Sequence, residues 1–192
     1  MKRKAESNVS TSVRNEHWSA GLLKTMKDPE SKVTEDDKIV VITDKYPKAQ
    51  FHYLILPKDN IPSIWHVKGK HHDLLMHMHN VACGLAEKQA EHEFIIGYHA
   101  IPSMQRLHLH VISTDFNGPC LKTKHHWNSF TTGFFLQSSD ICRQLREGGE
   151  IKKISSERYK AYLNTELKCH KCSMYPKNMP ELKRHLLTHI KK

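Results

Sequence analysis

GYHAIPSMQRLHLHVIS, residues 97–113, is the stretch that decides the fold of this chain. Polar and apolar residues alternate in its second half, which is the pattern of a β-strand with one buried face. Because successive side chains on a strand point to opposite faces, Arg106, His108 and His110 are predicted to share one face, opposite the leucines between them. The apolar face would pack into a core, and the other face would present two imidazoles about 6.6 Å apart.

A His-x-His pair on a strand is by itself more often a metal site or a plain polar face than a covalent catalyst. Two further histidines favour a catalytic cluster here, because His52 and His99 fall on other predicted strands. The turn at residues 97–103, which leads into the histidine strand, is of a kind that suits the approach of a phosphate. A regular strand also holds such groups in a fixed geometry better than a loop does.

The run RLHLHVIS resembles the signature of the histidine-triad (HIT) nucleotide hydrolases and transferases, in which histidines alternate with apolar residues. With DKYPKAQFHYLILP before it and a zinc-finger pattern after it, the resemblance extends over residues 18–189. One position departs from the family, because the first histidine of the triad is Arg106 here. The middle position, which is the nucleophile of the family, corresponds to His108 and is retained, so the departure concerns an outer hydrogen bond.

The resemblance implies a hydrolase of phosphoric anhydrides that works through a covalent nucleotidyl-histidine. His108 would attack the AMP phosphorus of an adenylated DNA 5′ end, His99 would assist the departing 5′-phosphate, and water would then release AMP. His52 and His110 would donate hydrogen bonds to the non-bridging oxygens. Such an enzyme would repair abortive-ligation ends in DNA single-strand breaks, including RNA–DNA ends, and the family's action on GMP-capped 3′ ends would extend to it.

A second set of residues would bind the substrate. An aspartate after a strand suits the hydroxyls of a ribose, because an ionised carboxylate only accepts hydrogen bonds. The resemblance implies contacts to phosphate from the turn that follows and from the histidine strand, and a helix at 18–27 beside the adenine and the DNA end. The substrate-binding candidates are Asp44, Lys48, Ser103, Arg106, Trp18 and Leu22.

The C-terminal segment carries the spacing C-x2-C-x12-H-x3-H. Two cysteines and two histidines complete a tetrahedral zinc shell, so the predicted site is structural and has no open position. The aromatic residue expected in a DNA-reading finger is displaced, since Tyr175 lies one place early, and we therefore expect the finger to brace the catalytic domain and contact phosphates. No catalytic metal is expected. The predicted zinc ligands are Cys169, Cys172, His185 and His189.

The net charge is +10, and residues 151–192 hold eleven of the 30 basic residues against three of the 20 acidic ones. A localised basic surface indicates a polyanionic partner such as nucleic acid. Residues 115–127 are predicted to be a basic loop by their Asn-Gly-Pro sequence, and a solvated loop is the alternative to a DNA contact. The DNA-binding candidates in this loop are Lys122, Lys124, His125 and Trp127.

Composition fits a soluble globular protein, with 38% hydrophobic and 26% charged residues. No apolar run approaches 18 residues and no secretory signal is visible, so neither a membrane partner nor export is expected. Scattered cysteines indicate a reducing compartment, and a nuclear location is expected from the inferred DNA substrate. The predicted divisions are a disordered basic terminus at 1–16, a HIT catalytic domain at 17–149, a connector at 150–167 and a zinc finger at 168–192.

The fold class expected is α+β, with an antiparallel HIT-type sheet, helices packed on one side of it, and a small C2H2-like finger. Longer members of the family carry a forkhead-associated domain ahead of the catalytic domain, and its absence here predicts a short form or a fragment. Two alternatives stay open, namely a general HIT hydrolase of small nucleotides and a non-catalytic DNA-binding finger protein. The sequence gives no indication of oligomeric state, protein partners or the preferred DNA end.

Overall fold

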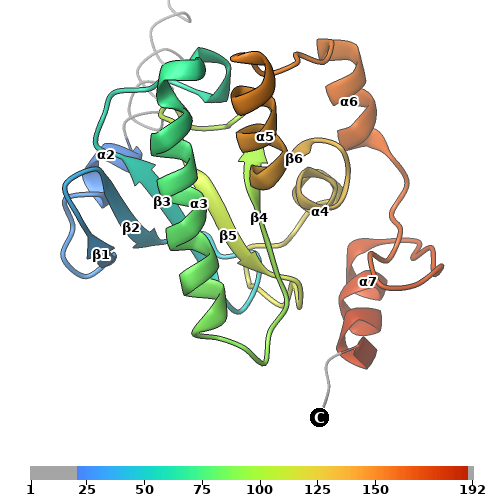
Figure 1. The fold of residues 1–192 in the computed structure, drawn as a ribbon. Helices are drawn as coiled ribbons and strands as arrows, with labels where there is room; N and C mark the ends of the chain where they lie inside the picture. The colour runs from blue at the N-terminus through green and yellow to red at the C-terminus, as the bar shows by residue number, and fades with distance from the viewer. Residues whose placement is uncertain (1–20, 190–192) are drawn as a thin grey trace, which may run out of the picture.

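The computed structural model describes residues 21–189. The predicted disorder of 1–16 and the candidate Trp18 therefore lie outside the described residues. Among those described, one six-stranded antiparallel sheet forms in the order β1-β2-β3-β5-β4-β6 (Figure 1). Its strands are β1 Lys32–Glu35, β2 Ile39–Thr43, β3 His52–Pro57, β4 Phe94–His99, β5 Leu109–Ser113 and β6 Phe135–Gln137.

The register of the sheet places His110 near its centre. His110 of β5 pairs with Leu54 of β3 on one side and with Gly97 of β4 on the other. A Cβ on Gly97 would lie 2.4 Å from the carbonyl oxygen of Leu136 and 2.7 Å from the ring of Phe135. Glycine at this position therefore allows β6 and its aromatic side chain to approach the centre of the sheet closely.

Helices α3 and α5 cover one face of the sheet (Figure 1). The predicted alternation is confirmed on this face, because the apolar residues of the histidine stretch pack against α3 (His72–Glu87) in the largest core cluster. Helix α5 (Ser138–Gly148) ends at Gly149, whose φ of 69° suits glycine in the left-handed region. Its N-cap residue, Gln137, makes no side-chain hydrogen bond to the helix.

The opposite face of the sheet is covered as well, so the expectation of helices on one side is wrong. Leu22 of α2 (Gly21–Thr25) packs there against Leu54 and Leu56 of β3. Helices α4 (Lys124–Thr131) and α7 (Met179–Leu186) pack over Ile112 of β5. The reason lies in β2 and β5, whose side chains are buried on both faces, so that each face needs a cover.

The basic loop predicted at 115–127 is a loop only in its first part, because α4 begins at Lys124. Thr123 caps this helix by accepting a hydrogen bond of 3.1 Å from the backbone N–H of His126. The segment at 150–167 contains the short helix α6 (Ser156–Asn164), and its Tyr159 is buried against Ala100 and Phe134 of the sheet domain. The connector therefore packs onto the sheet domain along its middle.

The zinc-finger segment shares a core with the sheet domain. Leu182 and Leu186 of α7 belong to the same buried cluster as Ile112 and Trp127. Helix α7 continues into one 3-10 turn, Leu187–His189, which carries the last predicted ligand. None of the helices in the described range is long and apolar enough to cross a membrane.

Candidate active site and zinc site

Four histidines from three strands and one approach segment meet around His110. The ring centroid of His110 lies 4.4 Å from that of His99, 4.9 Å from that of His108 and 5.3 Å from that of His52. The antiparallel pairing of β3, β4 and β5 brings these distant residues together, because it sets the end of β4 and the start of β3 on either side of β5. The structure thus collects all four histidines predicted to be catalytic.

His108 has one ring nitrogen occupied and one available. Its Nδ1 lies 2.8 Å from the carbonyl oxygen of Arg106. A carbonyl oxygen only accepts hydrogen bonds, so Nδ1 carries the proton and donates. The lone pair is then on Nε2, the nitrogen that a nucleophilic imidazole uses. Burial lowers the pKa of His108, so the ring is uncharged at neutral pH and its lone pair is available.

A chain of hydrogen bonds fixes the other side of the cluster. The backbone N–H of Lys48 donates to Nδ1 of His52 over 3.3 Å, and Nε2 of His52 lies 3.0 Å from Nδ1 of His110. Since Nδ1 of His52 accepts, its Nε2 carries the proton and donates to His110, which leaves the proton of His110 on Nε2. That Nε2 is buried and has no partner among the described residues, so it is a hydrogen-bond donor available to a ligand.

Burial keeps the inner histidines neutral. It lowers the pKa of His52 to about 4, and it lowers the pKa values of His99 and His110 well below the ordinary value, with neighbouring positive groups acting in the same direction. Phe130 of α4 provides much of the apolar wall, since its ring centroid lies 4.6 Å from that of His99 and 5.4 Å from that of His110. Neutral imidazoles can donate hydrogen bonds, but the positive charge of the site must come from elsewhere.

Lys48 is the cation beside this cluster. Its ammonium donates to the carbonyl oxygen of Tyr46, and burial lowers its pKa while the carboxylate of Asp44 opposes that shift. Asp44 accepts from the backbone N–H of Tyr46, and its second oxygen lies 3.3 Å from Nδ1 of His52. The structure therefore brings Asp44 and Lys48, two predicted substrate residues, to the same edge of the histidine cluster.

Asp44, His52 and His110 are also a group whose ligand atoms lie within 4.8 Å of one another. Asp44 and His110, however, face opposite nitrogens of the His52 ring. An ion bonded to one nitrogen of that ring would lie on the side away from the third group. Because these two groups lie on opposite sides of the ring, the arrangement fits a shared metal shell poorly, and the absence of a catalytic metal stays a prediction.

The space in front of His108 is narrow. It measures about 10 Å³ and is bordered by His99, Pro102 and Arg106. That volume holds no more than about one water molecule, so a nucleotide does not fit into this space as it stands. Ser103, the predicted phosphate contact, lies exposed in this turn, and Ile101 beside it is 50% exposed.

The guanidinium of Arg106 binds backbone carbonyl groups in this structure. Its Nη2 donates to the carbonyl oxygens of Pro57, Lys58 and Asp59 at 3.0, 2.8 and 3.3 Å. Its own backbone has a φ of 103°, a conformation that side chains other than glycine rarely adopt. Arg106, which replaces the first triad histidine, therefore holds the turn at 57–59 and presents its carbonyl oxygen to His108. A phosphate would have to compete with the three backbone carbonyl groups for its guanidinium.

The structure leaves some of the predicted DNA contacts exposed and buries others, and it also buries Leu22. Lys122 is exposed, whereas Lys124 and His125 bind Asn164 of α6. Trp127 is 1% exposed, and its Nε1 donates to the carbonyl oxygen of Lys168, so the interpretation of this tryptophan as a DNA contact is wrong. Leu22 is likewise 3% exposed and packs on the sheet.

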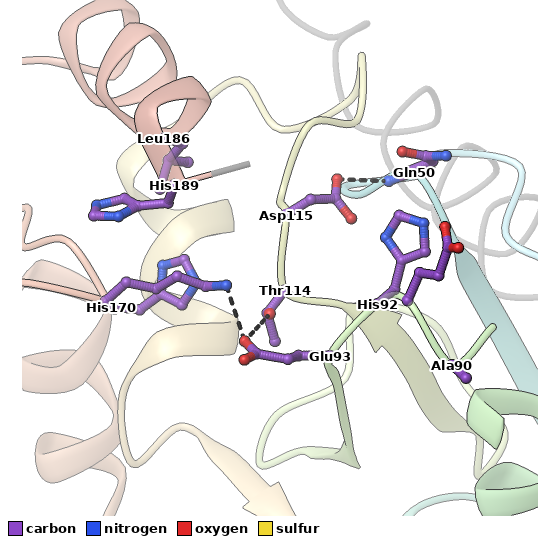
Figure 2. Close-up of a pocket in the computed structure, with 11 residues that line it drawn as sticks. Gln50, Ala90, His92, Glu93, Thr114, Asp115, His170, Leu186 and His189 are labelled. Carbon is purple, nitrogen blue, oxygen red and sulfur yellow. Dashed lines mark hydrogen bonds and ion pairs between the residues drawn. The ribbon is translucent and has the colours of Figure 1, made fainter. Parts of the chain in front are cut away.

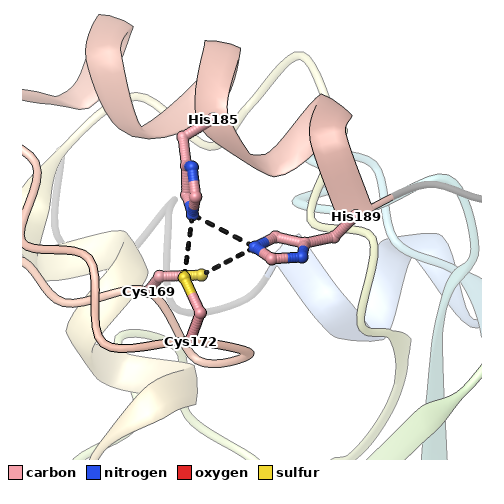
Figure 3. Close-up of side chains that lie close together, drawn as sticks. All are labelled: Cys169, Cys172, His185 and His189. Carbon is pink, nitrogen blue, oxygen red and sulfur yellow. Dashed lines mark hydrogen bonds between the residues drawn. The ribbon is translucent and has the colours of Figure 1, made fainter.

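The four predicted zinc ligands converge (Figure 3). Sγ of Cys169 lies 3.5 Å from Nε2 of His189, Sγ of Cys172 lies 3.2 Å from Nε2 of His185, and the two imidazole nitrogens lie 3.1 Å apart. Tetrahedral zinc with ordinary bond lengths separates such atoms by about 3.3–3.8 Å. The donor set fits a structural zinc ion, and the two shorter separations would lengthen slightly around it.

His170 is not part of this group. Its ring packs edge-on against Phe116 and Trp127, with centroids 5.1 and 5.3 Å away. The side chain after the first cysteine thus joins the finger to the aromatic core of the sheet domain.

A larger cavity that the sequence gave no sign of lies between the finger and the end of the sheet (Figure 2). It has a volume of about 680 Å³ and shares no residue with the space in front of His108. Glu93 closes part of it, because its Oε2 lies 2.9 Å from Nζ of Lys171 and accepts from Thr114 over 3.3 Å. The two charged partners are 78 residues apart, so no local pattern could have revealed the contact.

Two family models match the chain. The model described as "Scavenger mRNA decapping enzyme C-term binding" covers residues 17–126, and the model described as "C2HE / C2H2 / C2HC zinc-binding finger" covers residues 131–192. The second model agrees with the zinc ligands found above.

Several curated proteins are similar over most of this chain. Aprataxin of Ciona intestinalis is 47% identical over 96% of the chain, and aprataxin of Danio rerio is 46% identical over 91%. The matched regions span 49% and 54% of those relatives, so the chain corresponds to about half their length. An aprataxin-like protein of Saccharomyces cerevisiae is 30% identical over 79% of the chain and 83% of its own length.

Solved structures confirm the fold class. A crystal structure of the aprataxin ortholog Hnt3 in complex with DNA superposes with a TM-score of 0.73 at 22% identity, covering 92% of this chain and 94% of that one. A structure of Hnt3 in complex with DNA and guanosine gives a TM-score of 0.60 at 22% identity, covering 88% and 94%. The antiparallel sheet with packed helices, followed by a C2H2-like finger, is thus the fold that the sequence predicted.

Proposed function

Because this chain belongs to the aprataxin family of histidine-triad proteins, we propose that it is a DNA 5′-adenylate hydrolase. It would remove AMP from the 5′ ends that abortive ligation leaves at single-strand breaks, including RNA–DNA ends. The observation that carries the proposal is the hydrogen bond between Nδ1 of His108 and the carbonyl oxygen of Arg106, which leaves Nε2 as the nucleophile.

The first step transfers the adenylyl group to the protein. Nε2 of His108 attacks the phosphorus of the AMP moiety, and a bond from nitrogen to phosphorus forms. The anhydride bond to the DNA breaks, and its electron pair leaves with the 5′-phosphate oxygen. Because the leaving group is already an anion, it needs charge neutralisation more than it needs a proton.

The second step returns the histidine to its resting state. A water molecule attacks the phosphorus of the His–AMP adduct, the bond from nitrogen to phosphorus breaks, and AMP is released. The proton of the water passes to the phosphate product or the solvent, and Nε2 of His108 recovers its lone pair. The products are AMP and a DNA end with an ordinary 5′-phosphate.

The remaining site residues would stabilise the charge that develops on the phosphate. The unpartnered Nε2–H of His110 is a fixed donor for a non-bridging oxygen, and His52 holds it in that tautomer. His99, whose buried Nε2 has no partner among the described residues, would assist the departing 5′-phosphate. Lys48 supplies positive charge, and Asp44 accepts from the ribose hydroxyls.

Substrate entry would require the turn at 101–105 to move away from His108, since the present space holds about one water molecule. The turn is exposed on its outer side, which leaves it free to do so. Ser103 would then come to the phosphate as the turn closes on the nucleotide.

Nucleic acid is the proposed partner because of the basic segment at residues 151–192 and the family membership. Hnt3 has been crystallised with DNA and with DNA and guanosine, and we extend the proposal to 3′-linked GMP caps on that ground. Zinc would act as a structural cofactor that holds the finger, and we propose no catalytic metal. Action on chromosomal DNA would place the protein in the nucleus.

The test is AMP release from nicked DNA that carries a 5′-adenylate. His108→Ala should abolish release and the acid-quenched His–AMP adduct, while DNA binding at moderate salt stays within about twofold. His72→Gln, a half-buried histidine of α3 outside the site, is the matched control. Normal turnover by the His108 variant would refute the assignment of the nucleophile.

A wild-type rate that is higher on free diadenosine polyphosphate than on adenylated DNA would identify a small-nucleotide hydrolase instead. DNA binding with no adduct on any substrate would identify a non-catalytic finger protein.

A further inference from the structure

Helix α4 turns one face toward the histidine cluster. Phe130 on that face packs against the rings of His52, His99 and His110, with centroid distances of 5.6, 4.6 and 5.4 Å. Residues four apart on a helix lie above one another on the same face. His126 is therefore the side chain of α4 that stands one turn above Phe130, where the helix begins and the cluster meets solvent.

The ring of His126 is held in one orientation and one tautomer. The backbone N–H of Lys122 donates to its Nδ1 over 3.3 Å, so the proton of the neutral ring is on Nε2. Its own backbone N–H is held by the cap Thr123 at 3.1 Å, and its carbonyl oxygen accepts from Ser129 over 2.9 Å. A half-buried imidazole with a fixed backbone and an available Nε2–H is thus built into the first turn of the helix.

The contacts of Phe130 show which part of the site His126 adjoins. Among the three imidazoles that Phe130 contacts, His99 is the nearest, and His99 is the histidine expected to assist the departing 5′-phosphate. His126, one helical turn from Phe130, therefore adjoins the leaving side of the site. In an in-line displacement the leaving oxygen departs on the side opposite the nucleophile.

We propose that His126 binds the 5′-phosphate of the departing nucleic acid strand, so that it recognises the leaving side of the substrate. An anionic phosphate there would be held by Nε2–H of His126, by the ammonium of Lys48 and by the N-terminal end of α4, which is favourable for anions. The role of His126 rests on the proposed deadenylase function and adds to it a residue that discriminates between leaving groups. His99 and His110 cannot bind this phosphate as cations, because their burial against Phe130 keeps both rings uncharged.

The experiment compares two substrates that share AMP and differ in the leaving group. One is nicked DNA with a 5′-adenylate, whose leaving group is a phosphate. The other is adenosine 5′-monophosphoramidate, whose leaving group carries no phosphate. His126→Gln keeps an N–H donor of similar reach and removes the possibility of positive charge, and His72→Gln is again the matched control.

His126→Gln is expected to lower kcat/KM on adenylated DNA by about 10- to 100-fold, because an amide that stays uncharged replaces an imidazole that can gain a proton when the phosphate binds. The loss on the phosphoramidate should be at least tenfold smaller. An equal loss on both substrates, or no loss on either, would overturn the role of His126. These results are distinguishable from failure of the proposed function, in which the wild-type protein would not release AMP from adenylated DNA at all.

Discussion

The indole Nε1 of Trp127 donates a hydrogen bond of 3.1 Å to the carbonyl oxygen of Lys168. One buried side chain of the catalytic domain thereby holds the residue that immediately precedes the first zinc ligand. Around this bond the two parts of the chain form one core, since Leu167 and Cys169 are buried in the same cluster as Phe116 and Trp127. Zinc binding and the packing around the histidines are therefore coupled through aromatic side chains.

Trp127→Phe should lower the free energy of unfolding by about 1–3 kcal/mol, because it removes the bond to Lys168 and leaves part of the indole volume empty. The variant should also lose zinc to a chelator faster than the wild-type protein. Urea unfolding and a colorimetric zinc assay measure the two effects. Tyr175→Phe, at a side chain that is 59% exposed, is the control and should match the wild type. Equal stability of the Trp127 variant would show that the bond is dispensable.

Removal of zinc should destabilise the whole described fold and not the finger alone. Cys172→Ser removes one ligand, and the shared core predicts that a single cooperative thermal transition moves to lower temperature. Calorimetry with and without a chelator provides the measurement. Cys83→Ser, on α3 and remote from the ligand group, serves as the control. Two separate transitions, with the larger one unshifted, would contradict the coupling.

Arg106→Lys keeps the charge of the side chain and removes the Nη2 group that donates to three carbonyl oxygens. The carbonyl of Arg106 should then hold His108 less firmly, so kcat on adenylated DNA should fall by about tenfold while KM changes little. Steady-state kinetics at fixed salt separate the two parameters. Arg146→Lys, on the exposed side of α5, is the control. A raised KM with an unchanged kcat would indicate that Arg106 binds phosphate, as the sequence suggested.

The free energy of unfolding should decrease as the pH is lowered, and His52 should account for part of the decrease. Burial lowers its pKa to about 4 in the folded protein, against about 6.5 in an unfolded chain. Between these values the unfolded state binds more protons, so the contribution of His52 to stability is intact above pH 6.5. It falls by about 1.4 kcal/mol per pH unit on acidification and levels off below pH 4. The stability difference between wild type and His52→Gln should therefore shrink by about 2 kcal/mol from pH 6.5 to pH 5 in urea titrations. Parallel pH curves for the two proteins would show that His52 is protonated in the folded state.

The turn at 101–105 should change its exposure when a nucleotide binds, because the closed space beside His108 holds only about one water molecule. Hydrogen exchange of this turn is expected to slow when AMP is added in excess of its affinity. Exchange within β2, which is buried on both faces, should stay unchanged and provides the internal control. An unaltered turn in a protein shown to bind AMP would mean that the nucleotide enters elsewhere.

The sequence was sufficient for the features that depend on local pattern. The alternation around Leu107 and Leu109 fixed which side of the strand meets α3, and the spacing of Cys169 to His189 fixed the zinc site. Both patterns lie within a single stretch of chain. The sequence did not predict that helices also cover the second face of the sheet, because α4 is short and its first residues are basic, as in a solvated loop.

Contacts between distant residues account for the other differences. The burial of Trp127 depends on Lys168, 41 residues later, and the neighbours Lys124 and His125 gave the opposite impression. Arg106 donates hydrogen bonds to a turn 47–49 residues earlier in the chain, and the residues around Arg106 give no sign of this contact. The place of His126 beside the histidine cluster likewise follows from the packing of Phe130 against His99 and His110, and not from any spacing in the chain.

The common core of finger and sheet bears on how mutation could shorten this protein. A premature stop codon just before Cys169 would spare every histidine of the candidate active site, yet it would expose Trp127 and Phe116 to water. The truncated product would therefore be expected to aggregate or to be degraded, even though its catalytic sequence is complete. Loss of the chain from Cys169 onward would then have the same effect as loss of the sheet domain itself.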